Sequence, residues 1–75
     1  MPSTAIARHA YRPALGALDV RFVGGRVYRY FEVPEEVARG LARAESKGRY
    51  FNRAIRDRYR FERLPRWDEA DDGEA

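Results

Sequence analysis

The stretch LDVRFVGGRVYRYF, residues 18–31, carries the clearest structural signal in this chain. Its first five residues alternate apolar and polar side chains, with the period of two that is typical of a strand with one buried face. The pair Gly24-Gly25 can adopt the positive φ angles of a tight turn, and the β-rich run from Val27 to Phe31 follows it. The stretch therefore predicts a β-hairpin.

Two registers of this hairpin differ in the face that carries Tyr28 and Tyr30. A two-residue turn, formed by the glycine pair alone, would place both tyrosines on the face that carries Asp19 and Arg21. One residue of slip moves every side chain of a strand to the other face, so the turn decides which residues are buried. In this first register the exposed tyrosine rings would form a platform on which nucleic-acid bases could stack.

A three-residue turn that begins at Val23 gives the second register and puts both tyrosines on the core side. Val20 would then lie opposite Tyr28, and Asp19 would lie opposite Arg29. This register gathers the apolar side chains of both strands on one face, so we favour it over the first.

Further elements are expected on both sides of the hairpin. A strand is expected over residues 3–11, and another over residues 58–64, where the alternation returns. A first helix is expected over residues 34–47, because it opens with a proline and two glutamates, which suit a helix N-terminus. A second helix is expected over residues 49–58. Together they predict an α+β fold, in which an antiparallel sheet of three or four strands is covered on one face by two short helices.

The region around the corner between these helices carries two further expectations. Gly40 costs about 1 kcal/mol relative to alanine in the middle of a helix, so close packing against a neighbour is expected there. The corner itself, residues 46–52, is interpreted as a structural turn. The alternative is a phosphate-and-base pocket formed by exposed amides, Lys47, Arg49 and the Tyr50 ring.

Charge is distributed unevenly along the chain. Residues 1–66 carry fifteen basic and seven acidic side chains, whereas residues 67–75 carry five carboxylates and no basic group. Fourteen of the fifteen basic residues are arginine, whose planar guanidinium suits bidentate phosphate contacts and stacking. A basic domain, residues 1–66, suggests a polyanionic partner, and the alternative is an arginine-rich composition with a solubilising tail. We expect residues 67–75 to form a disordered tail that Trp67 pins at its base and that folds back on the arginine face.

Arg49, Arg53 and Arg56 follow spacings of four and three along the second predicted helix and would share one of its faces. Such a stripe is a candidate for contacts with successive phosphates, and the alternative is a solvated face. Arg29, Tyr28 and Tyr30 would add stacking groups to this nucleic-acid site wherever they are exposed.

Composition argues against several other functions. Seventy-five residues without cysteine make one small domain with no disulfide and no thiolate zinc site, which fits a reducing cytoplasm. His9 is the only histidine, so it has no second histidine or cysteine with which to form a metal site or a nucleophile–base pair. No apolar stretch approaches the ~20 residues of a membrane span. We therefore expect a soluble cytoplasmic protein that is not an enzyme and that binds no metal or cofactor.

Several short motifs occur in order along the chain. They are LxVxFxxG over residues 18–25, YxY over residues 28–30, VP at residues 33–34 and AxSxGxYFNxxIR over residues 44–56. In this order they resemble the KTSC domain, a small bacterial module named for its occurrence at the C-terminus of some lysyl-tRNA synthetases. The resemblance covers roughly residues 3–64, and Arg12 departs from it, because an acidic or small residue is expected there. It implies RNA binding as a suggestion, and it supplies no catalytic residues.

Two functions are compatible with these observations. The first is a non-catalytic module that binds RNA or single-stranded nucleic acid through its arginine-rich face. The second is a protein-interaction module that docks on a larger acidic partner through its arginines, or on a basic partner through its tail. Association that survives high salt and nuclease treatment would favour the second function.

Overall fold

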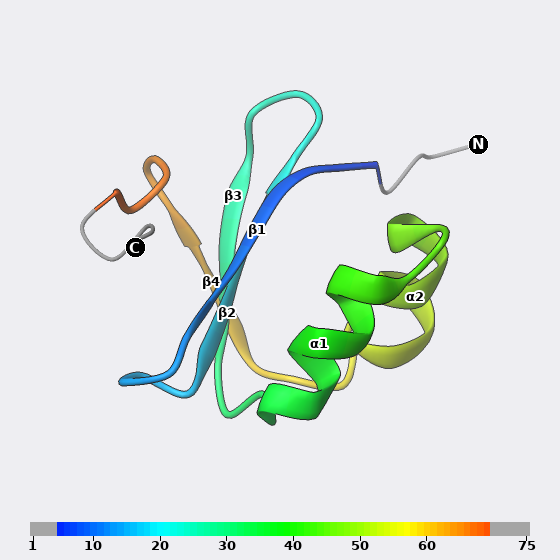
Figure 1. The fold of residues 1–75 in the computed structure, drawn as a ribbon. Helices are drawn as coiled ribbons and strands as arrows, with labels where there is room; N and C mark the ends of the chain where they lie inside the picture. Colours follow the sequence, from blue (N-terminus) through cyan, green and yellow to red (C-terminus); the bar gives the residue numbers. More distant parts are fainter. Residues whose placement is uncertain (1–4, 70–75) are drawn as a thin grey trace.

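A four-stranded antiparallel sheet with two helices on one side forms the domain (Figure 1). The computed structural model describes residues 5–69. The elements are β1 (Ile6–Arg12), β2 (Ala17–Phe22), β3 (Val27–Tyr30), α1 (Glu35–Arg43), α2 (Lys47–Ala54) and β4 (Phe61–Leu64). The strand order is β1-β2-β3-β4, so each strand pairs with its neighbours in sequence. The α+β fold is thus confirmed, with four strands.

The second hairpin register is the one observed. Val20 lies opposite Tyr28, and Asp19 lies opposite Arg29. The turn has three residues, because the amide of Phe22 donates to the carbonyl of Arg26 at 2.9 Å. Both glycines of the turn have positive φ, 111° at residue 24 and 101° at residue 25, which an L side chain rarely adopts.

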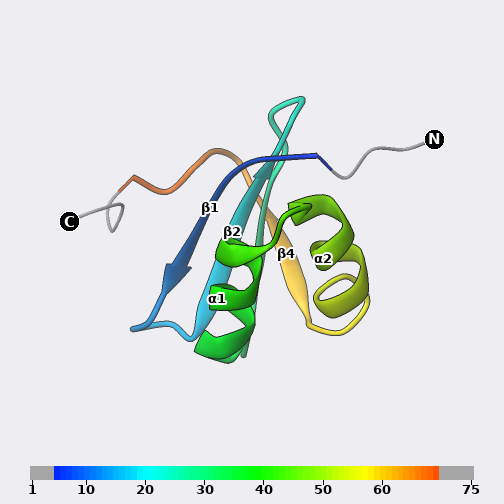
Figure 2. The same cartoon turned by 45° about the vertical axis from the view of Figure 1, so that its right-hand side comes forward.

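The core lies between the inner face of the sheet and the two helices, which cover that face from one side (Figure 2). Phe51 of α2 is its centre, with its ring centroid 5.3 Å from that of Phe22 and 5.4 Å from that of Tyr30. Both contacts are edge-to-face, the arrangement that aromatic pairs prefer. The other buried apolar residues of this core are Leu18, Val20, Val33, Ala38, Leu41 and Ile55.

The first helix is shorter than predicted, because α1 ends at Arg43 and not at Lys47. Ala44 is the C-cap of α1, and Ser46 begins a new helix, since its hydroxyl accepts a hydrogen bond from the amide of Arg49 at 3.3 Å. Lys47 is the first residue of that helix, and its ammonium donates to the carbonyl of Ala44 at 3.3 Å. A lysine in this place satisfies a free carbonyl at the end of α1.

The second helix also ends early, at Ala54 and not at Arg58. The chain leaves helical geometry at Ile55, and Asp57 has a φ of 65°. Arg56 therefore lies in the turn that follows α2 and not on the helix itself. The predicted last strand, residues 58–64, is limited to β4 for the same reason.

Gly40 is in close contact with Tyr50, as the sequence led us to expect. A Cβ on residue 40 would lie 2.5 Å from Cζ of Tyr50, a distance that side chains do not tolerate. The Tyr50 hydroxyl crosses this space and donates to the carbonyl of Val37 at 3.0 Å. The glycine thus lets α2 approach α1 closely enough for this hydrogen bond.

Candidate nucleic-acid interface

Arginines lie on both sides of the sheet, in different surroundings. One set lies on the outer face, which we define as the sheet face that is turned away from the helices. Three of its arginines, Arg8, Arg12 and Arg29, form ion pairs, and Arg21 of β2 lies on the same face and is exposed. A second set, which we call the α2 arginine surface, lies on α2 and in the turn after it. It comprises Arg49, Arg53, Arg56 and Arg58.

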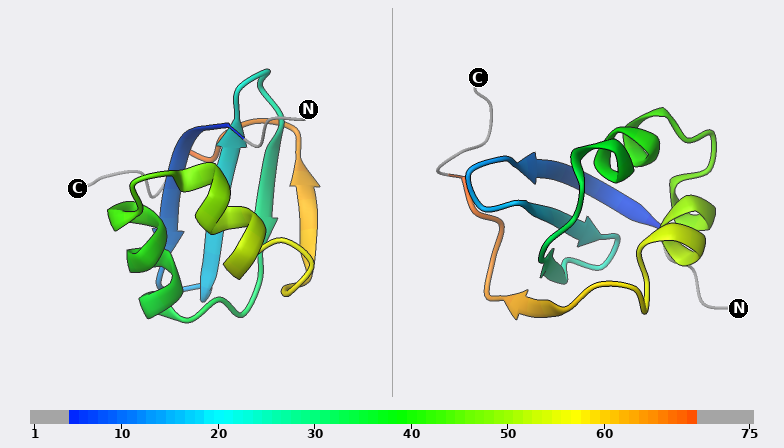
Figure 3. Two further views of the ribbon diagram at one scale, coloured as in Figure 1. Left: turned by 90° about the vertical axis from the view of Figure 1, so that its right-hand side faces the viewer. Right: turned by 90° about the horizontal axis from the view of Figure 1, so that it is seen from below.

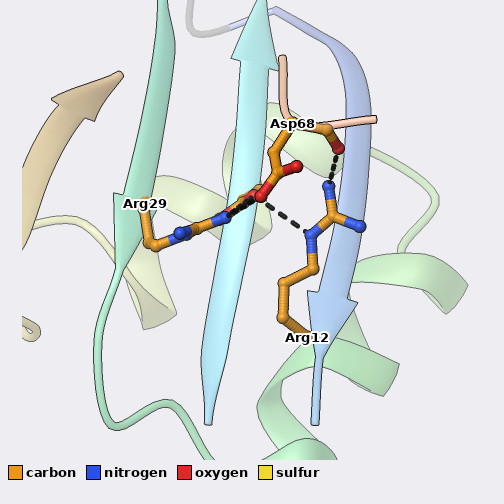
Figure 4. A network of polar contacts seen from close by, with 4 residues as sticks. Arg12, Arg29 and Asp68 are labelled. Carbon is orange, nitrogen blue, oxygen red and sulfur yellow. Dashed lines mark hydrogen bonds and ion pairs between the residues drawn. The ribbon is translucent and has the colours of Figure 1, made fainter. Parts of the chain in front are cut away.

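The outer-face set is built around a buried carboxylate. Asp19 is fully buried and accepts a hydrogen bond from Nε of Arg12 at 3.1 Å. It also accepts two from Arg29, from Nε at 2.7 Å and from Nη2 at 2.8 Å. The two arginines reach Asp19 from the strands on either side of β2 (Figure 4). A carboxylate inside a protein needs such partners, since an unpaired buried charge is costly.

The segment after β4 closes this network. Asp68 accepts a hydrogen bond from Nη2 of Arg29 at 3.0 Å through its carboxylate and one from Nη2 of Arg12 at 2.5 Å through its backbone carbonyl (Figure 4). The hydrogen bonds that Arg29 donates to Asp19, above all, and to Asp68 raise the pKa of Arg29 against the opposing effect of burial. Arg29 is therefore a fixed cation that is already neutralised.

Trp67 holds the same segment on the outer face. It is 6% exposed, and the guanidinium carbons of Arg8 and Arg12 lie 4.5 and 5.4 Å from its ring centroid. Both distances are within the range of cation–π contacts. Glu69 adds an ion pair to Arg8 at 3.6 Å. Trp67 and Glu69 thus both contact Arg8 of the outer face.

The predicted tail is only partly described. Trp67 packs on the sheet, as expected of the residue that pins the base of the tail, and Asp68 and Glu69 contact the sheet beside it. A tryptophan and two carboxylates meet a face rich in arginine there, so ordering them is favourable. The two described carboxylates of the tail, Asp68 and Glu69, form ion pairs with outer-face arginines and not with the α2 arginine surface. Residues 70–75 lie outside the described residues.

The four arginines of the α2 arginine surface are exposed. Among residues 5–69, no Asp or Glu oxygen lies within 4.0 Å of these guanidinium groups. Arg49 and Arg53 line one shallow hollow together with Glu45, Ser46 and Tyr50, and the Glu45 carboxylate forms no ion pair with either of them among the described residues. The guanidinium of Arg53 lies 5.6 Å from the Tyr50 ring centroid.

Two arginines extend this surface past the helix. Arg58 donates from Nε to the carbonyl of Arg53 at 3.0 Å, which brings the turn back against α2. Arg56 donates from Nη1 to Oδ1 of Asn52 at 3.3 Å. The structure therefore keeps the three predicted arginines of the stripe in one region, although Arg56 comes from the turn and not from the helix.

Other predicted site residues are occupied elsewhere. Tyr30 is 6% exposed and lies in the core, where burial, above all, raises its pKa to about 12. Tyr28 lies on the same inner face, so the two tyrosines form no exposed stacking platform. Arg29 belongs to the outer-face network. Lys47 donates to carbonyls at the end of α1, and Tyr50 is the only predicted ring that borders the arginine surface.

Sequence reasoning missed Phe61, the first residue of β4. It lies opposite Tyr30, on the side of the sheet that the helices occupy, and yet it is 55% exposed. The alternation over residues 58–64 signalled a strand there. Only its pairing with β3 fixes the face on which the ring lies.

The described residues, 5 to 69, contain no cluster of three or more His, Cys, Asp or Glu side chains that could hold a metal ion. His9 is half-buried between β1 and α1, and burial, followed by the charge of Lys47, lowers its pKa. Neither helix in this part of the chain is long and apolar enough to cross a lipid bilayer.

The sequence matches one protein family and several known proteins. The sequence model of the KTSC domain matches residues 2–59. A protein from Tsukamurella paurometabola is 47% identical over 58 residues, which make up 77% of this chain and 87% of that protein. A lysine–tRNA ligase from Nostoc punctiforme is 39% identical over 59 residues, which make up 79% of this chain and 10% of the ligase.

A solved structure has the same fold. The crystal structure of a KTSC domain protein from Yersinia pestis matches with a TM-score of 0.78 and 28% sequence identity, over 85% of this chain and 90% of that chain. Both β4 and Trp67 lie beyond the residues that the family model matches. On the family match and these relatives, the chain belongs to the KTSC domain family.

Proposed function

We propose that this chain is a non-catalytic module that binds RNA or another single-stranded nucleic acid through the α2 arginine surface. One observation carries the proposal: four exposed arginines are gathered on and just after α2, and no described carboxylate neutralises them. Guanidinium groups bind phosphate oxygens in bidentate geometry, and they need to be free of other anions to do so.

The contrast with the outer face supports this assignment. There the arginines of β1 and β3 are bound to Asp19, Asp68 and Glu69, so a phosphate would have to displace existing partners. The α2 arginines have no such competitors within the described residues. A polyanion is therefore expected to bind on the helix side of the molecule and not on the outer face.

Two further observations favour a nucleic acid over other polyanions and binding over catalysis. The chain resembles a region of lysine–tRNA ligases, enzymes whose name includes an RNA, although that region is 10% of the matched ligase. His9, the one histidine, has its pKa lowered by burial and lies next to α1.

We propose a cytoplasmic site of action. The likeness to a region of a lysine–tRNA ligase and the lack of cysteine support this location.

Fluorescence anisotropy with a labelled single-stranded RNA, measured over a range of salt concentrations, tests the proposal. The triple variant Arg49→Ala, Arg53→Ala, Arg56→Ala should bind more weakly, and the slope of log affinity against log salt should fall by about 2, at about 0.7 per phosphate contact. The matched control removes three exposed arginines elsewhere, with Arg21→Ala, Arg26→Ala and Arg66→Ala.

The control makes the outcomes distinguishable, because both variants lose the same charge. A much larger loss in the α2 variant supports the proposed surface. Equal losses in the two variants would assign binding to net charge alone and contradict it. If the wild-type chain binds no RNA even at low salt, the proposal fails and a protein partner becomes the function to test.

A further inference from the structure

The exposed ring of Phe61 results from the way in which the helices cover the sheet. Both helices lie over β1, β2 and β3, and β4 lies at the edge beyond them (Figure 3). Phe61 pairs with Tyr30, so its ring lies on the helix side of the sheet, but no helix covers it there. It is 55% exposed for this reason.

The Phe61 ring is held in place although it is exposed. Tyr28 contacts it edge-on, with centroids 5.5 Å apart and ring planes at 85°. Tyr30 lies 5.4 Å from it with ring planes at 35°, and Tyr30 is itself packed against Phe51 of α2. A ring that is already positioned loses little conformational entropy when a ligand binds.

Arginines are close to this ring on two sides. Arg63 lies two residues further along β4, on the same side of the sheet, and it is exposed. Burial is the largest cause that raises the pKa of Tyr30, and the charges of Arg56 and Asp57 act on it as well, Arg56 lowering it and Asp57 raising it, so Arg56 lies within electrostatic range of that hydroxyl beside a carboxylate. An aromatic face between exposed guanidinium groups is an arrangement that suits single-stranded nucleic acids, since bases stack on the ring and phosphates bind the cations.

We propose that Phe61 stacks on an unpaired base of a strand whose phosphates contact Arg56 and Arg63. This inference rests on the proposed function. It adds the requirement that the bound strand has an unpaired base, because bases in a duplex are stacked on each other and are not available to the ring. Phe61 lies beyond the residues that the family model matches, so the stacking position is assigned from this chain's own structure.

The test compares Phe61→Leu with Phe61→Trp in binding to single-stranded RNA. Leucine keeps an apolar side chain but removes the flat ring, so affinity should fall roughly 5- to 100-fold, as expected for loss of one base stack. The slope against salt should stay unchanged, because no cation is removed. Tryptophan should retain the wild-type affinity. Val23→Ala serves as the control, since Val23 is an apolar residue of the hairpin turn that is 64% exposed.

An oligonucleotide with abasic sites gives a second measurement that leaves the protein unchanged. The affinity of the wild-type chain for the abasic strand should fall to the affinity that Phe61→Leu has for the normal strand. The two proteins should bind the abasic strand equally well. If Phe61→Leu binds the normal strand as well as the wild type does, with the usual salt dependence, the stacking inference is wrong and the proposed function stands. If the wild-type chain does not bind any strand, the proposed function itself is wrong.

Discussion

Replacing Asp19 by asparagine should remove much of the stability of this domain. The substitution keeps the size of the side chain but takes away the charge that faces Arg12 and Arg29, and it puts an amide NH₂ where an acceptor oxygen was. Arg12 is 1% exposed and the Arg29 side chain 15%, so neither can turn to water without local unfolding.

The size of the effect follows from this burial. Breaking a buried ion pair by removing one partner costs about 3–5 kcal/mol, because the remaining charge is left without compensation. One oxygen of the asparagine can still accept from one arginine, so we expect about 3 kcal/mol. A chain of this length has a free energy of unfolding of about 4–11 kcal/mol, and the loss is therefore a large part of the total.

Urea denaturation measures the loss directly. With an m-value of about 1 kcal/mol/M, the midpoint should fall by about 3 M. The matched control is Glu35→Gln, which breaks the exposed pair with Arg39, where both side chains are more than 60% exposed. That pair should contribute no more than about 0.5 kcal/mol. A shift for Asp19→Asn no larger than the control's would refute the view that the outer-face network is structural.

Three further changes have defined outcomes. Gly40→Ala should lower the free energy of unfolding by about 1–3 kcal/mol through overlap with the Tyr50 ring, although alanine is the better helix former, and the urea midpoint should fall with it; a rise in the midpoint would contradict the contact. The pKa of His9 is lowered in the folded chain, so its contribution to stability is complete above pH 6.5 and is lost as the pH falls through the folded-state pKa. The free energy of unfolding of His9→Gln, measured from pH 7.5 down to 5, should therefore depend less on pH than that of the wild type. An unchanged pH dependence would contradict the lowered pKa of His9. Trp67→Ala should lower the free energy of unfolding by about 3 kcal/mol in thermal melts, and a wild-type melting temperature would mean that the segment after β4 does not hold the outer face.

Local patterns in the sequence predicted most of the fold. The alternation over residues 18–22 and the glycine pair identified the hairpin, and the gathering of apolar residues selected its register. The helix ends were less accurate, because they depend on single contacts. Ser46 starts a new helix two residues after Ala44 ends the first, and the positive φ of Asp57 turns the chain away from the helical stripe.

The candidate site was predictable only in part. The exposure of Arg49 and Arg53 follows from helical spacing, so their role as surface residues could be inferred. Arg29 could not be assigned in the same way, since Asp68, one of its partners, lies 39 residues along the chain and local spacing does not reveal that contact. Phe61 was missed because its exposure depends on which strands the helices cover.

The most direct test of the account is an NMR titration of the ¹⁵N-labelled chain with a short single-stranded RNA. The Nε–Hε signals of Arg49, Arg53 and Arg56 should shift together with increasing RNA, and those of Arg12 and Arg29 should stay in place because Asp19 already binds them. Shifts centred on Arg12 and Arg29, or no shifts at low salt, would contradict the claim that the free arginines beside α2 are the nucleic-acid interface.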